Sequence, residues 1–125
     1  MSRLSHTLPL VLILAAGPLH AHQDHLVPQY GGVTAEAGYF QVEAVSQGTR
    51  IILHLTQHGV PVAAKGAHGK LILLSGNGKS EAPLAVAGPH SLVAQFPAAP
   101  ASGAKAVATI DIPGTGAGNV RFVLK

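Results

Sequence analysis

The chain has 125 residues, contains no cysteine, and carries 8 lysines and arginines against 5 aspartates and glutamates, a formal net charge of +3. This length suits one small domain, and the missing cysteines exclude a disulfide scaffold and any zinc or iron–sulfur site held by thiolates. Because the cations form no basic run and aromatic residues make up only 4% of the chain, no nucleic-acid partner is expected.

Residues 1–21 are predicted to be a secretory signal peptide. Arg3 precedes an apolar stretch from Leu8 to Ala16, and Ala21 supplies the small residue before a cleavage site. The apolar stretch is far shorter than the roughly 20 residues of a transmembrane helix. We therefore expect a periplasmic or secreted protein that begins at His22 and has no membrane insertion after cleavage.

Residues 22–38 are predicted to form a flexible N-terminal arm that contains histidine. Pro28 and the Gly31-Gly32 pair interrupt any regular pattern there. The remaining residues, 39–125, are expected to form the folded domain.

Residues 39–125 contain seven short runs rich in Val, Ile, Leu and Thr, separated by turn residues, and no helical periodicity. This pattern is typical of an all-β fold, a small antiparallel β-sandwich or barrel of about seven strands. The clearest hairpin turn is expected across residues 75–79, where Gly and Asn tolerate a positive φ. The predicted strands are Tyr39 to Val45, Arg50 to Thr56, Lys70 to Leu74, Glu81 to Val86, Ser91 to Phe96, Lys105 to Ile112 and Asn119 to Leu124.

Histidine is the unusual component of this composition, with 8 in the chain. Imidazole suits Zn²⁺, Cu²⁺ and Ni²⁺, while thiolate and thioether ligands for Cu⁺ are missing once the initiating methionine is removed. Cleavage after Ala21 would give His22 a free amino group that can chelate Cu(II) together with its own imidazole. His25 or Asp24 would add a further donor, so this segment is the first predicted metal site.

His58 and His68 are the second predicted metal site. Each is followed by glycine, and a hairpin across residues 60–67 would bring the two rings together. His54 is expected on the outer face of its strand, pointing outward or under a loop, because the apolar residues alternate with it. His68 and His90 have an equally ordinary interpretation as solvated surface residues.

Carboxylates add little to these sites. Glu36, Glu43, Glu81 and Asp111 are expected to face solvent, and no calcium-binding loop is present. No serine stands in a nucleophile elbow, and a cysteine nucleophile is impossible, so an enzyme is not expected.

The order of several short motifs resembles a family of small exported proteins that occur beside heavy-metal efflux systems. A similar segment stands at the N-terminus of some periplasmic adaptor subunits of metal-exporting resistance pumps. The resemblance covers residues 31–125 and implies a β fold in a metal-related context, although the family pattern has His before the Gly-Gly pair, where this chain has Tyr30. The motifs are Gly31-Gly32-Val33, residues 35–38, Phe40 to Glu43, His58 to Val62, Gly69-Lys70-Leu71 and Leu74-Ser75-Gly76.

These observations favour a periplasmic module that binds a divalent transition metal, Cu(II), Zn or Ni, and buffers it or delivers it to an efflux system. The alternative is a non-catalytic interaction or adaptor domain that docks a pump component, with incidental histidines. The expected partners are thus a metal ion and a periplasmic efflux-pump subunit.

Overall fold

The computed structural model describes residues 26–125, and every regular element in that range is a strand. The predicted signal peptide and the candidate ligands His22, Asp24 and His25 lie outside the described residues. The strands are β1 (Val33–Glu36), β2 (Gln41–Gln47), β3 (Arg50–Gln57), β4 (Val60–Pro61), β5 (His68–Ser75), β6 (Gly78–Gly88), β7 (Ser91–Gln95), β8 (Lys105–Ile112) and β9 (Gly116–Val123).

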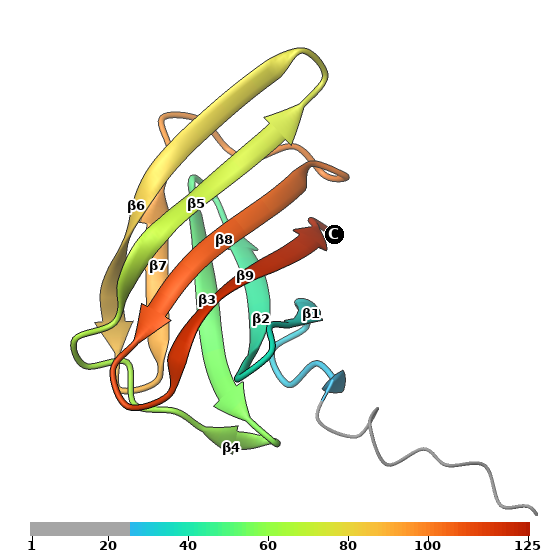
Figure 1. Ribbon diagram of the computed structural model, residues 1–125. Coiled ribbons are helices and arrows are strands. Elements are labelled where there is room, and N and C mark those ends of the chain that lie inside the picture. Colours follow the sequence, from blue (N-terminus) through green and yellow to red (C-terminus); the bar gives the residue numbers. More distant parts are fainter. Residues whose placement is uncertain (1–25) are drawn as a thin grey trace, which may run out of the picture.

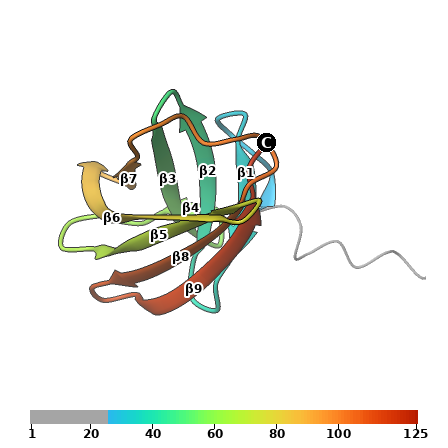
Figure 2. The same ribbon diagram turned by 90° about the horizontal axis from the view of Figure 1, so that it is seen from above.

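The strands form one antiparallel sheet that curls into a nearly closed barrel (Figure 1). The order is β1-β2-β3-β7-β6-β5-β8-β9, and the short β4 pairs only with β3. Seen from above, β5, β8 and β9 form the wall opposite β2 and β3 (Figure 2). The sequence left a sandwich and a barrel as alternatives, and the structure is the barrel-like one.

The barrel comes closest to closing where β1 approaches β9. A Cβ on Gly118 would lie 2.9 Å from the Cβ of Ala37, so this approach needs a residue without a side chain. Farther along the seam, Nζ of Lys125 lies 3.4 Å from the carbonyl oxygen of Gly31. The seam is therefore held by packing and one exposed contact, while β1 and β9 exchange no ladder hydrogen bonds.

The core fills the inside of the barrel with side chains at alternating strand positions. In β3, Ile51, Leu53 and Leu55 are buried, while the intervening residues are only partly buried. Burial alternates from one residue to the next in a strand with one face in the core, because successive side chains point to opposite faces of the sheet. The largest fully buried side chains are Phe40, Ile51, Leu53, Leu55, Leu71, Leu92, Ile110, Ile112, Val42 and Val120.

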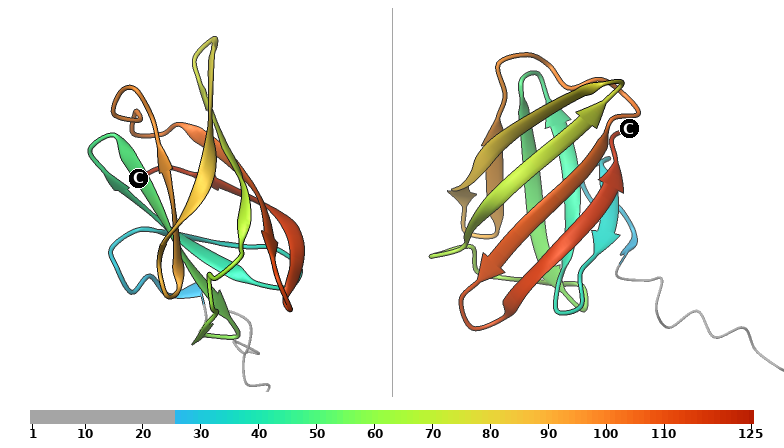
Figure 3. Two further views of the ribbon diagram at one scale, coloured as in Figure 1. Left: turned by 90° about the vertical axis from the view of Figure 1, so that its left-hand side faces the viewer. Right: turned by 45° about the horizontal axis from the view of Figure 1, so that its top comes forward.

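All seven predicted strands are present: β8 has the predicted bounds, and the other six are shifted at one end or both. The predicted turn at residues 75–79 is also confirmed, because Ser75 pairs with Gly78 and leaves a two-residue loop with Gly76 at φ +56°. The boundary of the arm is wrong: residues 33–36, assigned to it, form β1 and pair with β2. In the right-hand view of Figure 3 this strand lies at the edge of the sheet.

Within residues 26–125, no helix has the length and apolar character needed to span a bilayer.

Candidate functional site

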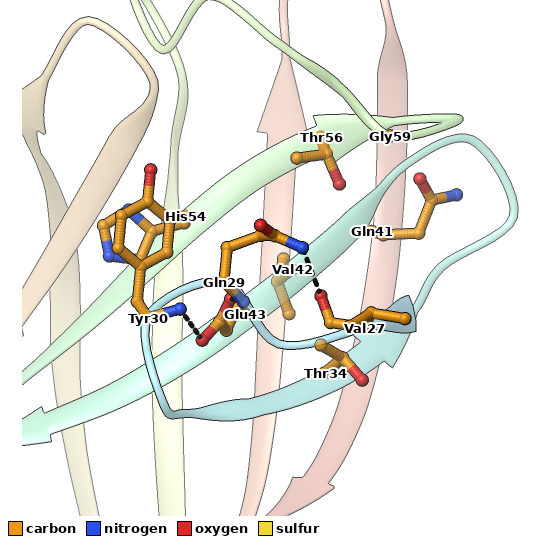
Figure 4. Close-up of a pocket in the computed structure, with 10 residues that line it drawn as sticks. All are labelled: Val27, Gln29, Tyr30, Thr34, Gln41, Val42, Glu43, His54, Thr56 and Gly59. Carbon is orange, nitrogen blue, oxygen red and sulfur yellow. Dashed lines mark hydrogen bonds between the residues drawn. The ribbon is translucent and has the colours of Figure 1, made fainter. Parts of the chain in front are cut away.

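A cleft with both polar and apolar side chains on its walls lies on the outside of β2 and β3, where the loop of residues 26–32 crosses them (Figure 4). We call this loop the N-terminal loop and the hollow beneath it the N-terminal cleft. Its volume is about 140 Å³. The lining residues are Val27, Gln29, Tyr30, Thr34, Gln41, Val42, Glu43, His54, Thr56 and Gly59.

Glu43 holds the N-terminal loop against the sheet. Its Oε1 accepts a hydrogen bond from the backbone N–H of Gln29 at 2.6 Å. Its Oε2 accepts from the N–H groups of Tyr30 and Gly32, both at 2.8 Å. The side chain is only 6% exposed, so the prediction that Glu43 faces solvent is wrong. The loop covers the outer face of β2 and replaces water as the partner of the carboxylate.

Gly32 explains how the loop approaches β2 so closely. A Cβ at this position would lie 2.3 Å from the carbonyl oxygen of Ala44, well inside van der Waals contact. Gly31 beside it has φ +72°, in the left-handed region that favours glycine. The Gly31-Gly32 pair, assigned to a flexible arm from sequence, is instead the point at which the loop turns into β1.

Gln41 plays a similar part at the other end of the cleft. It is buried on the same outer face of β2, and its Oε1 accepts a hydrogen bond of 2.9 Å from the N–H of His58. His58 has φ +51° in the turn between β3 and β4. The two buried polar residues of β2 thus each fix one loop that borders the cleft.

His54 lies under the ring of Tyr30. The two rings are stacked, with centroids 3.8 Å apart and planes inclined by 13°. His54 is opposite Glu43 in the β2–β3 ladder. The prediction that His54 points to the outer face or under a loop is confirmed.

Burial and hydrogen bonding move the pKa values of this pair. Burial lowers the pKa of His54 below its usual 6.5, and the nearby charge of Glu43 opposes this only in part. Burial by itself would raise the pKa of Glu43, but the backbone N–H groups of Gln29, Gly32 and Tyr30, with His54, lower it below 4.5. At neutral pH the cleft therefore holds a neutral imidazole beside an ionised carboxylate.

Three backbone N–H groups already bond to the two oxygens of Glu43, so about one lone-pair position of the carboxylate remains for a further donor or a ligand. Among residues 26–125, no three His, Asp or Glu side chains come close enough together to hold a metal ion.

The predicted hairpin between His58 and His68 is wrong. The strand that follows His58, β4, pairs back onto β3, whereas His68 opens β5 and pairs with β8. The Nε2 of His68 lies 3.9 Å from the carboxylate of Asp111, and both side chains are well exposed. Metal binding by His58 and His68 stays a prediction, without the local geometry expected for it.

The imidazole of His90 makes a hydrogen bond within the fold. Its Nδ1 lies 2.9 Å from the carbonyl oxygen of Val62, which can only accept, so this nitrogen carries the proton. Its own carbonyl oxygen accepts from the N–H of Leu55. His90 therefore joins the β6–β7 turn to the segment after β4.

The roles of Tyr30, Gln29 and Gln41 in this cleft do not follow from the sequence patterns described above. The signal that was present is the Gly-Gly pair, since adjacent glycines often mark a close backbone approach as well as a flexible chain. An acidic residue in a strand of otherwise buried residues, Glu43 beside Val42 and Ala44, was a second indication.

Comparison with protein-family models, curated proteins and solved structures gives no match to this chain.

Proposed function

We propose that the protein binds a divalent transition-metal ion, Cu(II), Zn(II) or Ni(II), through His22, Asp24 and His25. In this proposal it buffers the ion or delivers it to an efflux system in the periplasm, and it is not an enzyme. The observation that carries the proposal is that these three donors directly precede a loop that is fixed to the sheet.

The attachment of this loop supports the proposal because it limits where the donors can go. The carbonyl oxygen of Leu26 accepts a hydrogen bond of 2.7 Å from Oγ1 of Thr34, and Glu43 holds the next residues. His22 is four residues before Leu26, so its Cα can lie at most about 14 Å from that of Leu26.

The donor set suits a site that takes up and releases metal. Two imidazoles and a carboxylate, with the amino group of a processed His22, match the ligand preferences of Cu(II), Zn(II) and Ni(II). Donors that come from four consecutive positions of one short segment exchange ligands readily, which suits transfer more than storage. The mechanism proposed is ligand exchange.

The test is a calorimetric titration of each metal into protein exported through its own leader, with the N-terminus verified by intact mass. His22→Ala/His25→Ala should lose tight Cu(II) binding. The matched control, His58→Ala/His68→Ala, also removes two imidazoles and should keep it. Equal affinity in the first variant and the unaltered protein would refute the role of the N-terminal segment, and loss in the control would move the site to His58 and His68.

The open seam between β1 and β9 supports a second candidate, an adaptor domain that docks a pump component. Small β-domains bind partners by adding a strand at an unpaired edge. In this alternative the histidines are incidental. A partner that stays bound under strong chelation, together with no metal in the purified protein, would favour it.

A further inference from the structure

Exposed aliphatic and cationic side chains gather on the outer face of β6, β5, β8 and β9. These strands form the wall nearest the viewer in Figure 1. The strand registers arrange them in two adjacent rows near the C-terminal end of β5. We call these two rows the cationic face. The first row is Lys79, Leu74, Lys105 and Val123, and the second is Glu81, Ile72, Val107 and Arg121.

Large aliphatic side chains in the first row are unusually exposed for the outside of a sheet. Leu74 is 42% and Val123 is 53% exposed, and Lys105 lies between them in the register. In the second row, Val107 and Ile72 are partly buried beside Arg121. Aliphatic groups thus alternate with cations in the first row, across β6, β5, β8 and β9.

The cations of this face are not neutralised within the described part of the chain. No carboxylate there lies within 4.0 Å of Lys79, Lys105 or Arg121. Glu81, the only acid in the two rows, faces Lys70 at 3.5 Å. The end of the sheet that carries the aliphatic groups therefore has a local excess of positive charge.

A hollow of about 480 Å³ opens beside the first row. It lies between the β5–β6 turn and the loop before β8, both of which contain a glycine with positive φ and no side chain to cover it. Hydroxyl groups and a lysine on its wall are suitable donors for a phosphate group. The lining residues are Leu74, Ser75, Gly76, Ser102, Gly103, Ala104 and Lys105.

We propose that the cationic face binds the surface of a membrane that contains anionic phospholipids, with a headgroup phosphate in the hollow beside Lys105. Cations attract the anionic surface, and short aliphatic side chains between them enter the headgroup layer. This face fits a lipid surface better than a protein, because the core of a protein interface is depleted of charged residues, whereas Lys105 stands between Leu74 and Val123 here. This binding is peripheral and independent of metal binding.

The expected affinity is modest and depends on salt. Each lysine or arginine at an anionic surface strengthens binding about fivefold, so two of them account for about 25-fold. The attraction falls off within the Debye length of about 8 Å at physiological ionic strength. The face should hold the protein at a membrane reversibly.

The test is co-sedimentation of the exported protein with vesicles, in the presence of a chelator. One set contains phosphatidylglycerol and phosphatidylcholine in equal amounts, and the other contains phosphatidylcholine alone. Lys105→Gln/Arg121→Gln should weaken binding to the anionic vesicles about 25-fold. The matched control, Arg50→Gln/Lys65→Gln, removes the same charge elsewhere and should change binding about twofold or less.

A second variant tests the aliphatic groups at constant charge: Leu74→Thr/Val123→Thr should also weaken binding to anionic vesicles, and circular dichroism should show an intact sheet. All variants carry the same N-terminal segment, so differences between them report the face alone. Equal loss in both charge variants, or no binding to anionic vesicles at low salt, would overturn the proposal. Binding of soluble polyglutamate without vesicle binding would overturn it too, and assign the face to an acidic protein.

Discussion

Replacing Glu43 by glutamine is expected to destabilise the protein by about 2–4 kcal/mol, although the two side chains have nearly the same shape. Glutamine keeps one acceptor oxygen, which can serve Tyr30 and Gly32, while its amide nitrogen then faces the N–H of Gln29. Losing that bond and leaving a partly buried donor unpaired costs about 1–3 kcal/mol. Weakening the other two from charged to neutral acceptors adds about 1 kcal/mol.

The measurement is urea unfolding followed by far-UV circular dichroism, since the chain has no tryptophan. Glu81→Gln is the matched control, because its carboxylate is exposed and faces only Lys70 at 3.5 Å. Such a pair contributes about 0–1 kcal/mol. Amide exchange should also accelerate at Gln29, Tyr30 and Gly32 in Glu43→Gln alone.

Two results together would refute the role of Glu43. If the unfolding free energy of Glu43→Gln lies within about 0.5 kcal/mol of that of the unaltered protein, and the amides of the N-terminal loop stay protected from hydrogen exchange, the carboxylate does not hold the loop. A large loss of stability in Glu81→Gln would also contradict this role of Glu43. The destabilisation would then come from removing any negative charge and not from the hydrogen bonds that Glu43 makes.

Three further predictions concern the same cleft. The unfolding free energy should fall in two steps on acidification. Below pH about 6.5 the first step comes from His54, because the unfolded chain takes up this proton more readily than the folded protein and is favoured by it. Below pH about 4.5 the second step comes from Glu43, because protonation removes the stabilisation that its lowered pKa reflects. Urea midpoints against pH should show both steps, and His54→Asn should remove the contribution of His54 to the first. Gly32→Ala should lower the unfolding free energy by more than about 2 kcal/mol. The control Gly38→Ala should change it little, because the space around Gly38 is open. Equal effects of the two substitutions would contradict the close approach of Gly32 to the backbone of Ala44. Tyr30→Ala should raise the pKa of His54 toward 6.5 by exposing its ring, as an NMR titration would show; an unchanged pKa would mean that the stack does not bury the ring.

The strands of the barrel could be predicted because their signal is local. In β3 the alternation of Ile51, Leu53 and Leu55 with less buried residues identifies both the strand and its core face. The turn at residues 75–79 was equally local, since glycine at a two-residue loop accepts the required backbone angles. The ends of these seven strands differ from the prediction by at most three residues, and β1 and β4 are the two strands that were not predicted.

The hairpin predicted for His58 and His68 failed because strand pairing is not local. Nothing in residues 58–68 indicates that β4 returns to β3 while β5 pairs with β6 and β8. The choice depends on which apolar faces fill the barrel together. Spacing along the chain could not decide it.

The sequence by itself determined the all-β class, the number of main strands and the core positions, because each depends on side-chain alternation over a few residues. Only the tertiary structure decided that the barrel nearly closes, that residues 33–36 join the sheet, and that Glu43 is buried. The physical reason is separation along the chain: Glu43 bonds to residues 11 to 14 positions before it. The carboxylate that appears solvent-facing in its own strand acquires its partners only when the N-terminal loop folds over β2.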